Sequence, residues 1–260
     1  METAFVYADG GYGEILLGRD IGVARRFYEG SPSVFGFHTA TNPRLDTSGI
    51  ATIRTANDLT GPALKISYAS PRFLGLRLGA SYTPRANVSG VDRDPASNVA
   101  GVAETRLETG LETAFNFRHR FAKSGVRLES YGAYSRADVE FDATNVDFGT
   151  VEVWSTGGRV EWENVEIGAD WLTTDNGAGR YRAWSLGAKT RLFETDVSAE
   201  FGRSFDDSTG IDGRSWSVGA SREIWKKLTI TAGIQQQSLL LTGVQTDNSL
   251  GPVFEMTLRY

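Results

Sequence analysis

The sequence predicts an all-β fold, namely a transmembrane antiparallel β-barrel of about 13 strands. Three observations predict it. Apolar and polar residues alternate with period two over most of the chain, as they do in strands with two different faces. Short and long connections alternate between these segments. Aromatic residues cluster near the segment ends, where a membrane barrel carries its interfacial girdles.

Composition fits this class. The chain has 260 residues, a net charge of -5, 30 glycines and only 7 prolines, which favours many strands with tight turns. No stretch approaches the roughly 18 consecutive apolar residues of a transmembrane helix. The chain has no cysteine, which excludes disulfides and thiolate metal sites, and no basic patch for nucleic acid. The first residues contain no signal peptide, so we expect an exported protein to have lost one, or the sequence to begin inside the mature chain.

The first 61 residues contain two strand candidates and a long irregular segment. Residues 3–8 and 14–19 are expected strands, joined by an Asp- and Gly-rich turn. The face pattern of the second strand is ambiguous, because Ile15, Leu16 and Leu17 are all apolar. Residues 20–61 show neither period, and a loop of about 40 residues inside a β domain is usually functional.

Regular alternation begins after this loop. We expect strands at 64–68, 74–83, 106–117 and 126–135. In the third of them, Leu107, Thr109 and Leu111 are expected on one face, opposite Glu108 and Glu112.

The C-terminal half repeats the pattern. Strands are expected at 154–162, 165–171, 184–192, 197–202, 215–221, 228–235 and 253–260. The expected short turns are Glu163-Asn164, Glu194-Thr195-Asp196 and Lys226-Lys227, and the expected long loops lie at about 137–149, 173–180, 204–213 and 238–251. Short periplasmic turns and longer external loops are typical of outer-membrane barrels.

A soluble β-sandwich or lipocalin-like barrel would show the same alternation. The number of strands is too large for a small closed soluble barrel. The polar face carries charges together with many small residues, which suits a spacious, wet lumen. The strict alternation of connection lengths also favours the membrane barrel.

Two segments and the last residue resemble the Gram-negative general porins, especially those of alphaproteobacteria. They are Gly11-Tyr12-Gly13-Glu14-Ile15-Leu16-Leu17-Gly18-Arg19-Asp20, the later Pro32-Ser33-Val34-Phe35-Gly36, and Tyr260. The resemblance covers most of the chain and implies a 16-stranded barrel, of which residues 1–260 look like strands four to sixteen in a single domain. Residues 20–61 would be the constriction loop that folds into the pore.

The same resemblance implies a location and partners. The location would be the outer membrane of a Gram-negative bacterium. The partners would be two further copies in a homotrimer, outer-membrane lipid and lipopolysaccharide, and the barrel-assembly machinery, which would bind the strand ending at Tyr260.

The implied function is a water-filled channel for passive diffusion of ions and small hydrophilic solutes. The candidate constriction residues are Asp20, Arg25, Arg26, Glu29, Arg44, Asp46 and Asp58. The candidate pore-wall residues are Arg19, Lys65, Arg77, Arg106, Glu112, Arg127, Arg159, Lys189 and Arg191. Opposed acidic and basic groups across a narrow aqueous pore would create a transverse field. The alternative is a structural or surface-anchoring barrel without an open pore.

No enzymatic site is expected. The chain has two histidines, His38 and His119, and neither belongs to a recognisable catalytic constellation. Asp92-Arg93-Asp94 lacks the spacing of a calcium loop. We therefore expect no metal and no cofactor.

Overall fold

The alternating segments form one antiparallel sheet of 13 strands, in which each strand pairs with its neighbours in the sequence. The computed structural model describes residues 3–44, 50, 52–87, 105–141, 147–175, 179–241 and 244–258. The strands are β1 (Ala4–Gly10), β2 (Gly13–Asp20), β3 (Ala63–Ala69), β4 (Leu76–Asn87), β5 (Thr105–Arg120), β6 (Arg127–Phe141), β7 (Asp147–Trp162), β8 (Val165–Asp175), β9 (Arg180–Leu192), β10 (Thr195–Asp206), β11 (Ile211–Trp225), β12 (Leu228–Leu241) and β13 (Val244–Leu258). The expected all-β class and strand number are confirmed.

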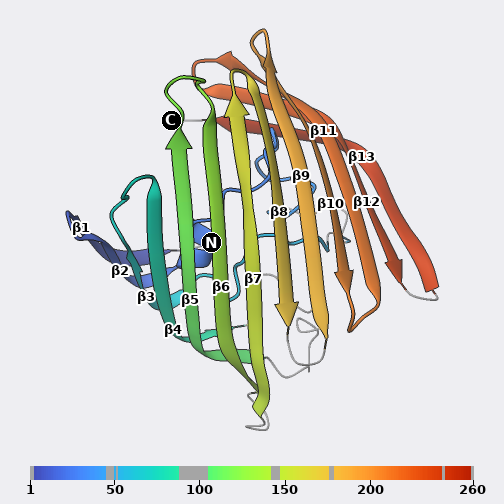
Figure 1. Ribbon diagram of the computed structural model, residues 1–260. Coiled ribbons are helices and arrows are strands. Elements are labelled where there is room, and N and C mark those ends of the chain that lie inside the picture. The colour runs from blue at the N-terminus through green and yellow to red at the C-terminus, as the bar shows by residue number, and fades with distance from the viewer. Residues whose placement is uncertain are drawn as a thin grey trace.

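The sheet curls into an incomplete barrel with a concave inner face (Figure 1). Its strand order is linear, and among the described residues β1 and β13 do not pair with each other. The connections at one end of the sheet, called the turn end here, are residues 11–12, 70–75, 121–126, 163–164, 193–194 and 226–227. The opposite end is called the loop end.

The two faces of the sheet differ in the way that the alternation predicts. In β8, Ile167 and Trp171 point outward and are 52% and 44% exposed, whereas Asp170 points inward and is 3% exposed. Exposed aliphatic and aromatic side chains recur on the outer face of most other strands. An apolar outer face is what a barrel needs toward lipid.

Several strands continue beyond the expected positions at the loop end. The strands β6, β8, β10 and β12 end at Phe141, Asp175, Asp206 and Leu241, so most of the long loops expected at 137–149, 173–180, 204–213 and 238–251 are strand. The alternation of apolar and polar residues is present only where the two faces of a strand have different surroundings. The hydrogen-bonded pairing of the backbone continues beyond that part, so the strands are longer than the pattern predicts. The expected strict alternation of short and long connections is therefore wrong. The turn expected at 194–196 lies at Phe193-Glu194.

A β-bulge changes the face pattern of β5. Pairing with β6 shifts between Glu108 and Leu111, and Thr109 has a φ of 49°. An extra residue reverses the side-chain phase. Leu107 therefore points inward and is 1% exposed, whereas Leu111 points outward and is 53% exposed. The expectation that both share one face is wrong for this reason.

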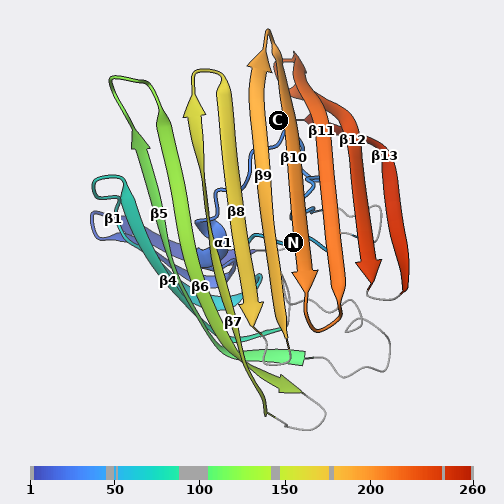
Figure 2. The same ribbon diagram turned by 45° about the vertical axis from the view of Figure 1, so that its right-hand side comes forward.

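Residues 21–62, called the inner segment here, connect β2 to β3 and contain the helix α1 (Val23–Arg26). Figure 2 shows α1 and the chain that follows it inside the curve of the sheet. In the part of the chain that the structure describes, no helix is long and apolar enough to cross a membrane.

Candidate functional site

The inner segment crosses the concave face from β4 to β13 and then returns. Near its start, the backbone N–H of Val23 donates to Oγ of Ser81 on β4 at 2.9 Å. Further along, the N–H of Val34 donates to Oγ of Ser198 on β10 at 2.9 Å. On the return path, Asn57 accepts a hydrogen bond from Ser135 on β6 at 3.0 Å. The described part of the segment is therefore attached to the wall at points far apart along the chain.

Inward-pointing carboxylates provide the main attachments. Glu255 on β13 accepts hydrogen bonds from the N–H groups of Gly36 at 2.8 Å, Phe37 at 3.0 Å and His38 at 2.8 Å. Its Oε1 also lies 3.0 Å from Nδ1 of His38. One carboxylate thus satisfies three consecutive N–H donors in a partly buried stretch of backbone.

Glu200 on β10 serves the next part of the segment. It accepts from the N–H of Ala40 at 2.8 Å and from the hydroxyl of Thr41 at 2.5 Å. The hydroxyl of Ser31 is 3.3 Å away. The carboxylate is 3% exposed, so these donors replace the water it has lost.

A third attachment joins both ends of the segment. Glu112 on β5 accepts from the N–H of Ala24 at 3.2 Å and from the hydroxyl of Thr60 at 2.5 Å. Lys65 on β3 donates to the same Thr60 hydroxyl at 2.7 Å and to the carbonyl of Gly61 at 2.8 Å. Glu112 and Lys65 are 3% and 2% exposed, so both lie beneath the segment.

Small inward residues let the segment approach the sheet. A Cβ atom on Gly187 would lie 2.6 Å from the carbonyl oxygen of Pro32, and one on Gly219 would overlap the ring of Phe35. Glycine at these positions leaves the space that the segment occupies.

An apolar cluster seals the segment against the wall at the loop end. Leu59 packs with Leu107, Val153 and Leu172, and all four are at most 1% exposed. Inward apolar residues on these strands were not expected, because the inner face was predicted to be polar. Leu59 covers them, which removes them from water.

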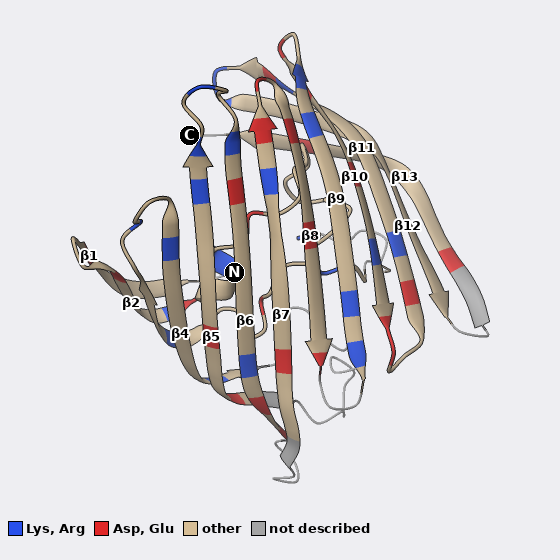
Figure 3. Ribbon diagram, viewed as in Figure 1, with Lys and Arg blue, Asp and Glu red and all other residues tan. Residues whose placement is uncertain are grey.

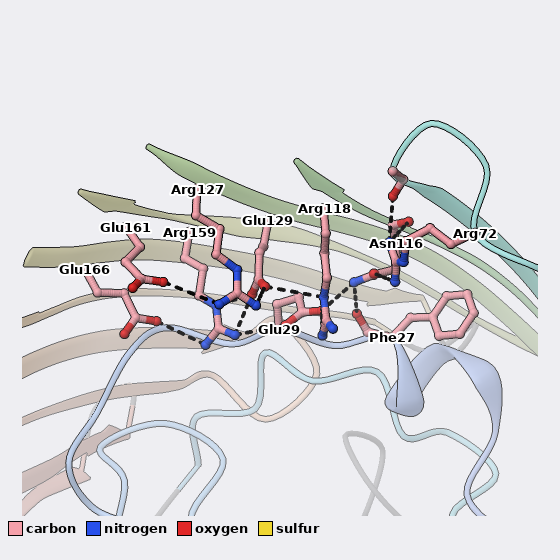
Figure 4. A network of polar contacts seen from close by, with 11 residues as sticks. Phe27, Glu29, Arg72, Asn116, Arg118, Arg127, Glu129, Arg159, Glu161 and Glu166 are labelled. Carbon is pink, nitrogen blue, oxygen red and sulfur yellow. Dashed lines mark hydrogen bonds and ion pairs between the residues drawn. The ribbon is translucent and has the colours of Figure 1, made fainter. Parts of the chain in front are cut away.

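Charged side chains meet around Glu29 at the turn end of β5, β6 and β7 (Figure 4). Glu29 accepts from Arg118 at 2.6 Å and from Arg159 at 3.2 Å. Arg159 also contacts Glu129 at 2.5 Å and Glu166 at 3.1 Å. This network links a carboxylate of the segment to basic residues of β5 and β7 and, through Arg159, to Glu129 on β6.

A second charged group lies beside α1. Glu14 on β2 contacts Arg26 at 2.6 Å and Arg77 on β4 at 2.9 Å. The guanidinium of Arg77 also lies over the ring of Phe27. Figure 3 shows how basic and acidic bands alternate over neighbouring strands.

Asp58 is the titratable group of the segment with the clearest shift. Burial raises the pKa of its carboxyl to about 6, and Glu112 adds to this, whereas Arg25 and Lys65 oppose it. Its Oδ1 is buried without a hydrogen-bond partner. This carboxyl therefore titrates closer to neutrality than an exposed aspartate.

The expected constriction residues fall into three groups. Arg26 and Glu29 are held by ion pairs. Asp20, Arg25, Arg44 and Asp58 are half-buried or exposed on the inner side, with Arg25 over the ring of Tyr28. Asp46 lies outside the described residues.

The expected wall residues need one correction. Arg19 lies on the outer face with Ile15 and Leu17, because Gly18 and Asp20 carry the inward phase of β2. The side chain of Arg106 lies outside the described part of the structure. The inward residues Arg77, Arg127, Arg159, Lys189 and Arg191 remain on the concave side, and Lys65 and Glu112 lie under the segment.

Residues absent from the expected site include Glu14, Arg118, Glu200 and Glu255. A signal was present for Glu200, which stands as a single acid between Ser198 and Gly202 on the inward face. An acid among small inward residues indicates that another part of the chain approaches it.

A one-sheet chain with an apolar outer face and a polar segment over its inner face fits the class of outer-membrane β-barrels. Residues 2–239 match the Gram-negative porin family. The chain therefore belongs to this family, and it is an outer-membrane diffusion channel of a Gram-negative bacterium. The family and the fold are those of a non-enzymatic channel.

Solved structures share the fold at low sequence identity. The outer membrane channel DcaP of Acinetobacter baumannii has a TM-score of 0.67 and 11% identity, over 98% of this chain and 73% of that chain. OmpF of Salmonella typhi, in a complex with daunomycin, has a TM-score of 0.62 and 15% identity, over 98% and 77%. The anion-selective porin of Comamonas acidovorans has a TM-score of 0.60 and 13% identity, over 98% and 74%. Among curated proteins, none matches in sequence.

Proposed function

We propose that the inner segment is the constriction of a water-filled pore for ions and small hydrophilic solutes. The observation that carries this proposal is the series of attachments from β5 to β13 made by Glu112, Glu200 and Glu255. A segment held at so many points narrows the lumen by a fixed amount. Its free side, with Arg25 and Arg44, would then face the solute.

Charge would set the preference of this pore. Basic residues of the wall and one acidic residue of the segment, Glu29, meet in the network at the turn end, and the field between opposite charges would act on the lumen beside it. Dipolar solutes orient in such a field. A structural barrel without an open pore is the less favoured function, because the family consists of porins.

Partners are proposed on the same basis. Two further copies would complete a homotrimer, and the apolar outer face would contact outer-membrane lipid and lipopolysaccharide. The C-terminal end of the chain would bind the barrel-assembly machinery; its last residue, Tyr260, lies outside the described residues. The unpaired edges of β1 and β13 would cost several kcal/mol per unsatisfied backbone group in hydrocarbon. We propose that further strands fill this gap and that the turn end faces the periplasm.

A disulfide tests the position of the segment in a conducting channel. Oγ of Ser31 lies 3.1 Å from Oγ of Ser185, so cysteines at both positions would place two sulfurs side by side. The chain has no other cysteine, so any intramolecular bond is unambiguous. The variant, purified from outer membranes, would be measured in a planar bilayer before and after reduction.

We expect rapid disulfide formation and the same stepwise conductance in both states. A matched pair, Ser31→Cys with Ser221→Cys on β11, should not form the bond. Failure of the first pair to bond would place the segment elsewhere. Folded protein that never conducts would contradict the open pore itself.

A further inference from the structure

A shallow cavity of about 250 Å³, open to solvent, lies at the turn end of β5 and β6. Its lining residues are Arg118, His119, Arg120 and Arg127, and none of them is acidic. A cavity with this lining suits a small anion with several acceptor oxygens, because guanidinium groups bind phosphate and carboxylate through paired hydrogen bonds.

Two of the lining arginines lie directly opposite each other on the neighbouring strands β5 and β6. Arg120 is the register partner of Arg127 in the pairing of β5 with β6. Like charges directly opposite each other destabilise a sheet. Arg127 contacts Glu129 at 2.6 Å, whereas Arg120 has no ion pair with any residue that the structure describes. An anion between these two groups would offset the repulsion.

The nearby carboxylates are already shared. Glu129 contacts three guanidinium groups, those of Arg118 at 3.4 Å, Arg127 at 2.6 Å and Arg159 at 2.5 Å. Figure 4 shows these groups on one side of the sheet, with Arg72 beyond Arg118. Arg118 also contacts Glu29, and Arg127 also contacts Glu161 at 3.6 Å. Among the four lining residues, Arg120 is therefore the arginine without an ion pair to a described residue.

The imidazole of His119 is held at the cavity by aromatic neighbours. It stacks on Phe117 with ring centroids 6.2 Å apart, and it meets Phe121 edge to face at 4.6 Å. Phe121 is 46% exposed, so this side of the cavity borders the surface. A fixed imidazole beside the cavity would sense a ligand directly.

We propose that this cavity binds a phosphate group, held mainly by Arg120 and Arg127. Two sources carry this chemistry. One is inorganic phosphate or a phosphorylated solute at the pore mouth, and the other is the headgroup of a phospholipid around the turn end. This site is separate from the proposed constriction, because it lies on the rim of the sheet. Its occupancy can be measured without any measurement of conductance, so the two proposals can fail independently.

Histidine NMR tests the site. The chain has only two histidines, so a sample with ¹³C-labelled histidine gives two imidazole signals. His38 contacts Glu255 and serves as the internal reference. Protein from outer membranes, in a phosphate-free neutral detergent, would be titrated at constant pH and ionic strength with inorganic phosphate. A second sample would receive short-chain phosphatidylglycerol, and a third the matched diacylglycerol without phosphate.

We expect a saturable shift of the His119 signal and no shift of the His38 signal. Arg120→Gln should weaken the binding at least tenfold, whereas Lys123→Gln, a charge change in the same turn outside the lining, should leave it unchanged. A shift with inorganic phosphate assigns the site to free anions, and a shift with the phospholipid alone assigns it to the headgroup. Absence of a shift in every sample, or equal shifts in wild type and Arg120→Gln, would overturn the proposal.

Discussion

Glu255 on the last strand and His38 in the inner segment are joined by two contacts through one carboxylate oxygen. Oε1 of Glu255 accepts from the backbone N–H of His38 at 2.8 Å and lies 3.0 Å from its Nδ1. The two residues are 217 positions apart in the sequence. The contact therefore fixes the far point of the segment against the edge of the sheet.

Replacement of Glu255 should detach the part of the inner segment around His38 from β13. Glu255→Ala leaves the N–H groups of Gly36, Phe37 and His38 without their acceptor, at a cost of about 2–3 kcal/mol in docking of the segment. We expect noisier single-channel currents and faster proteolysis within the segment. Glu223→Gln removes an exposed carboxylate near the turn end and is the control. Quiet currents and unchanged proteolysis in Glu255→Ala would show that the contact is dispensable.

Asp58 should make stability depend on pH. The pKa of its carboxyl rises from 3.8 to about 6 in the folded protein, so the folded state holds this proton at a pH where the unfolded chain has lost it. The free energy of unfolding therefore falls as the pH rises through this window. Asp58→Asn removes the free-energy cost of ionising this buried carboxyl. It should stabilise the protein by up to about 3 kcal/mol above pH 6, with little effect below pH 4.

Urea unfolding in lipid vesicles between pH 4 and 8 would measure this difference. The exposed Asp9, changed to Asn, is the control and should show no comparable gain. An equal difference between Asp58→Asn and wild type at all pH values would mean that the charge of Asp58 is not the cause.

Arg159 and Glu29 should affect ion preference in opposite directions. Each carries a charge in the network at the turn end, and their side chains lie 3.2 Å apart. Arg159→Gln should shift the reversal potential in a salt gradient toward cations, and Glu29→Gln toward anions. Arg159→Gln should also destabilise the protein by about 2 kcal/mol, because it leaves charged acceptors with fewer donors.

Arg191→Gln provides the comparison for this pair. Arg191 is 62% exposed and lies 3.9 Å from Asp196, so its removal should cost almost no stability. Identical reversal potentials in Arg159→Gln, Glu29→Gln and wild type would place the network away from the path of the ions.

Gly219 should tolerate no side chain beneath Phe35. A Cβ atom at Gly219 would overlap the ring of Phe35, so Gly219→Ala forces the ring and its neighbours to move, at about 1–3 kcal/mol. Gly251→Ala is the matched control, because a Cβ atom there meets nothing within 4 Å. Thermal unfolding of both variants would measure the cost, and equal melting temperatures would contradict the close packing.

Most of the fold could be predicted from the sequence, because a lipid-facing strand needs one apolar and one polar face. The strand number and the inward phase of β6 to β9 follow from this rule. It fails at Leu107, where a bulge reverses the phase, and at Arg19, where three apolar residues hide it. It also fails at the loop end, where strands such as β10 continue as polar hairpins.

Less of the site could be predicted, because it depends on which wall residues the inner segment touches. Lys65 and Glu112 have the phase of pore-wall residues, yet Thr60 covers both of them. Glu200 and Glu255 bind backbone N–H groups of the segment. At Glu200 the local signal is a single acid among small inward residues, and it does not say which part of the chain, 160 positions away, makes the contact.

The apolar cluster of Leu59, Leu107, Val153 and Leu172 lies between the inner segment and the wall, so the segment has one side packed on the wall and another side turned away from it. In the function proposed above, one side of the inner segment is fixed to the wall and the other side selects the solutes. Under that proposal, a mutation on the free side, at Arg44 for example, would change which molecules pass and would leave the attachment to the wall intact. Solute selectivity could therefore evolve through substitutions on that free surface alone, without any change in the residues that attach the segment to the wall.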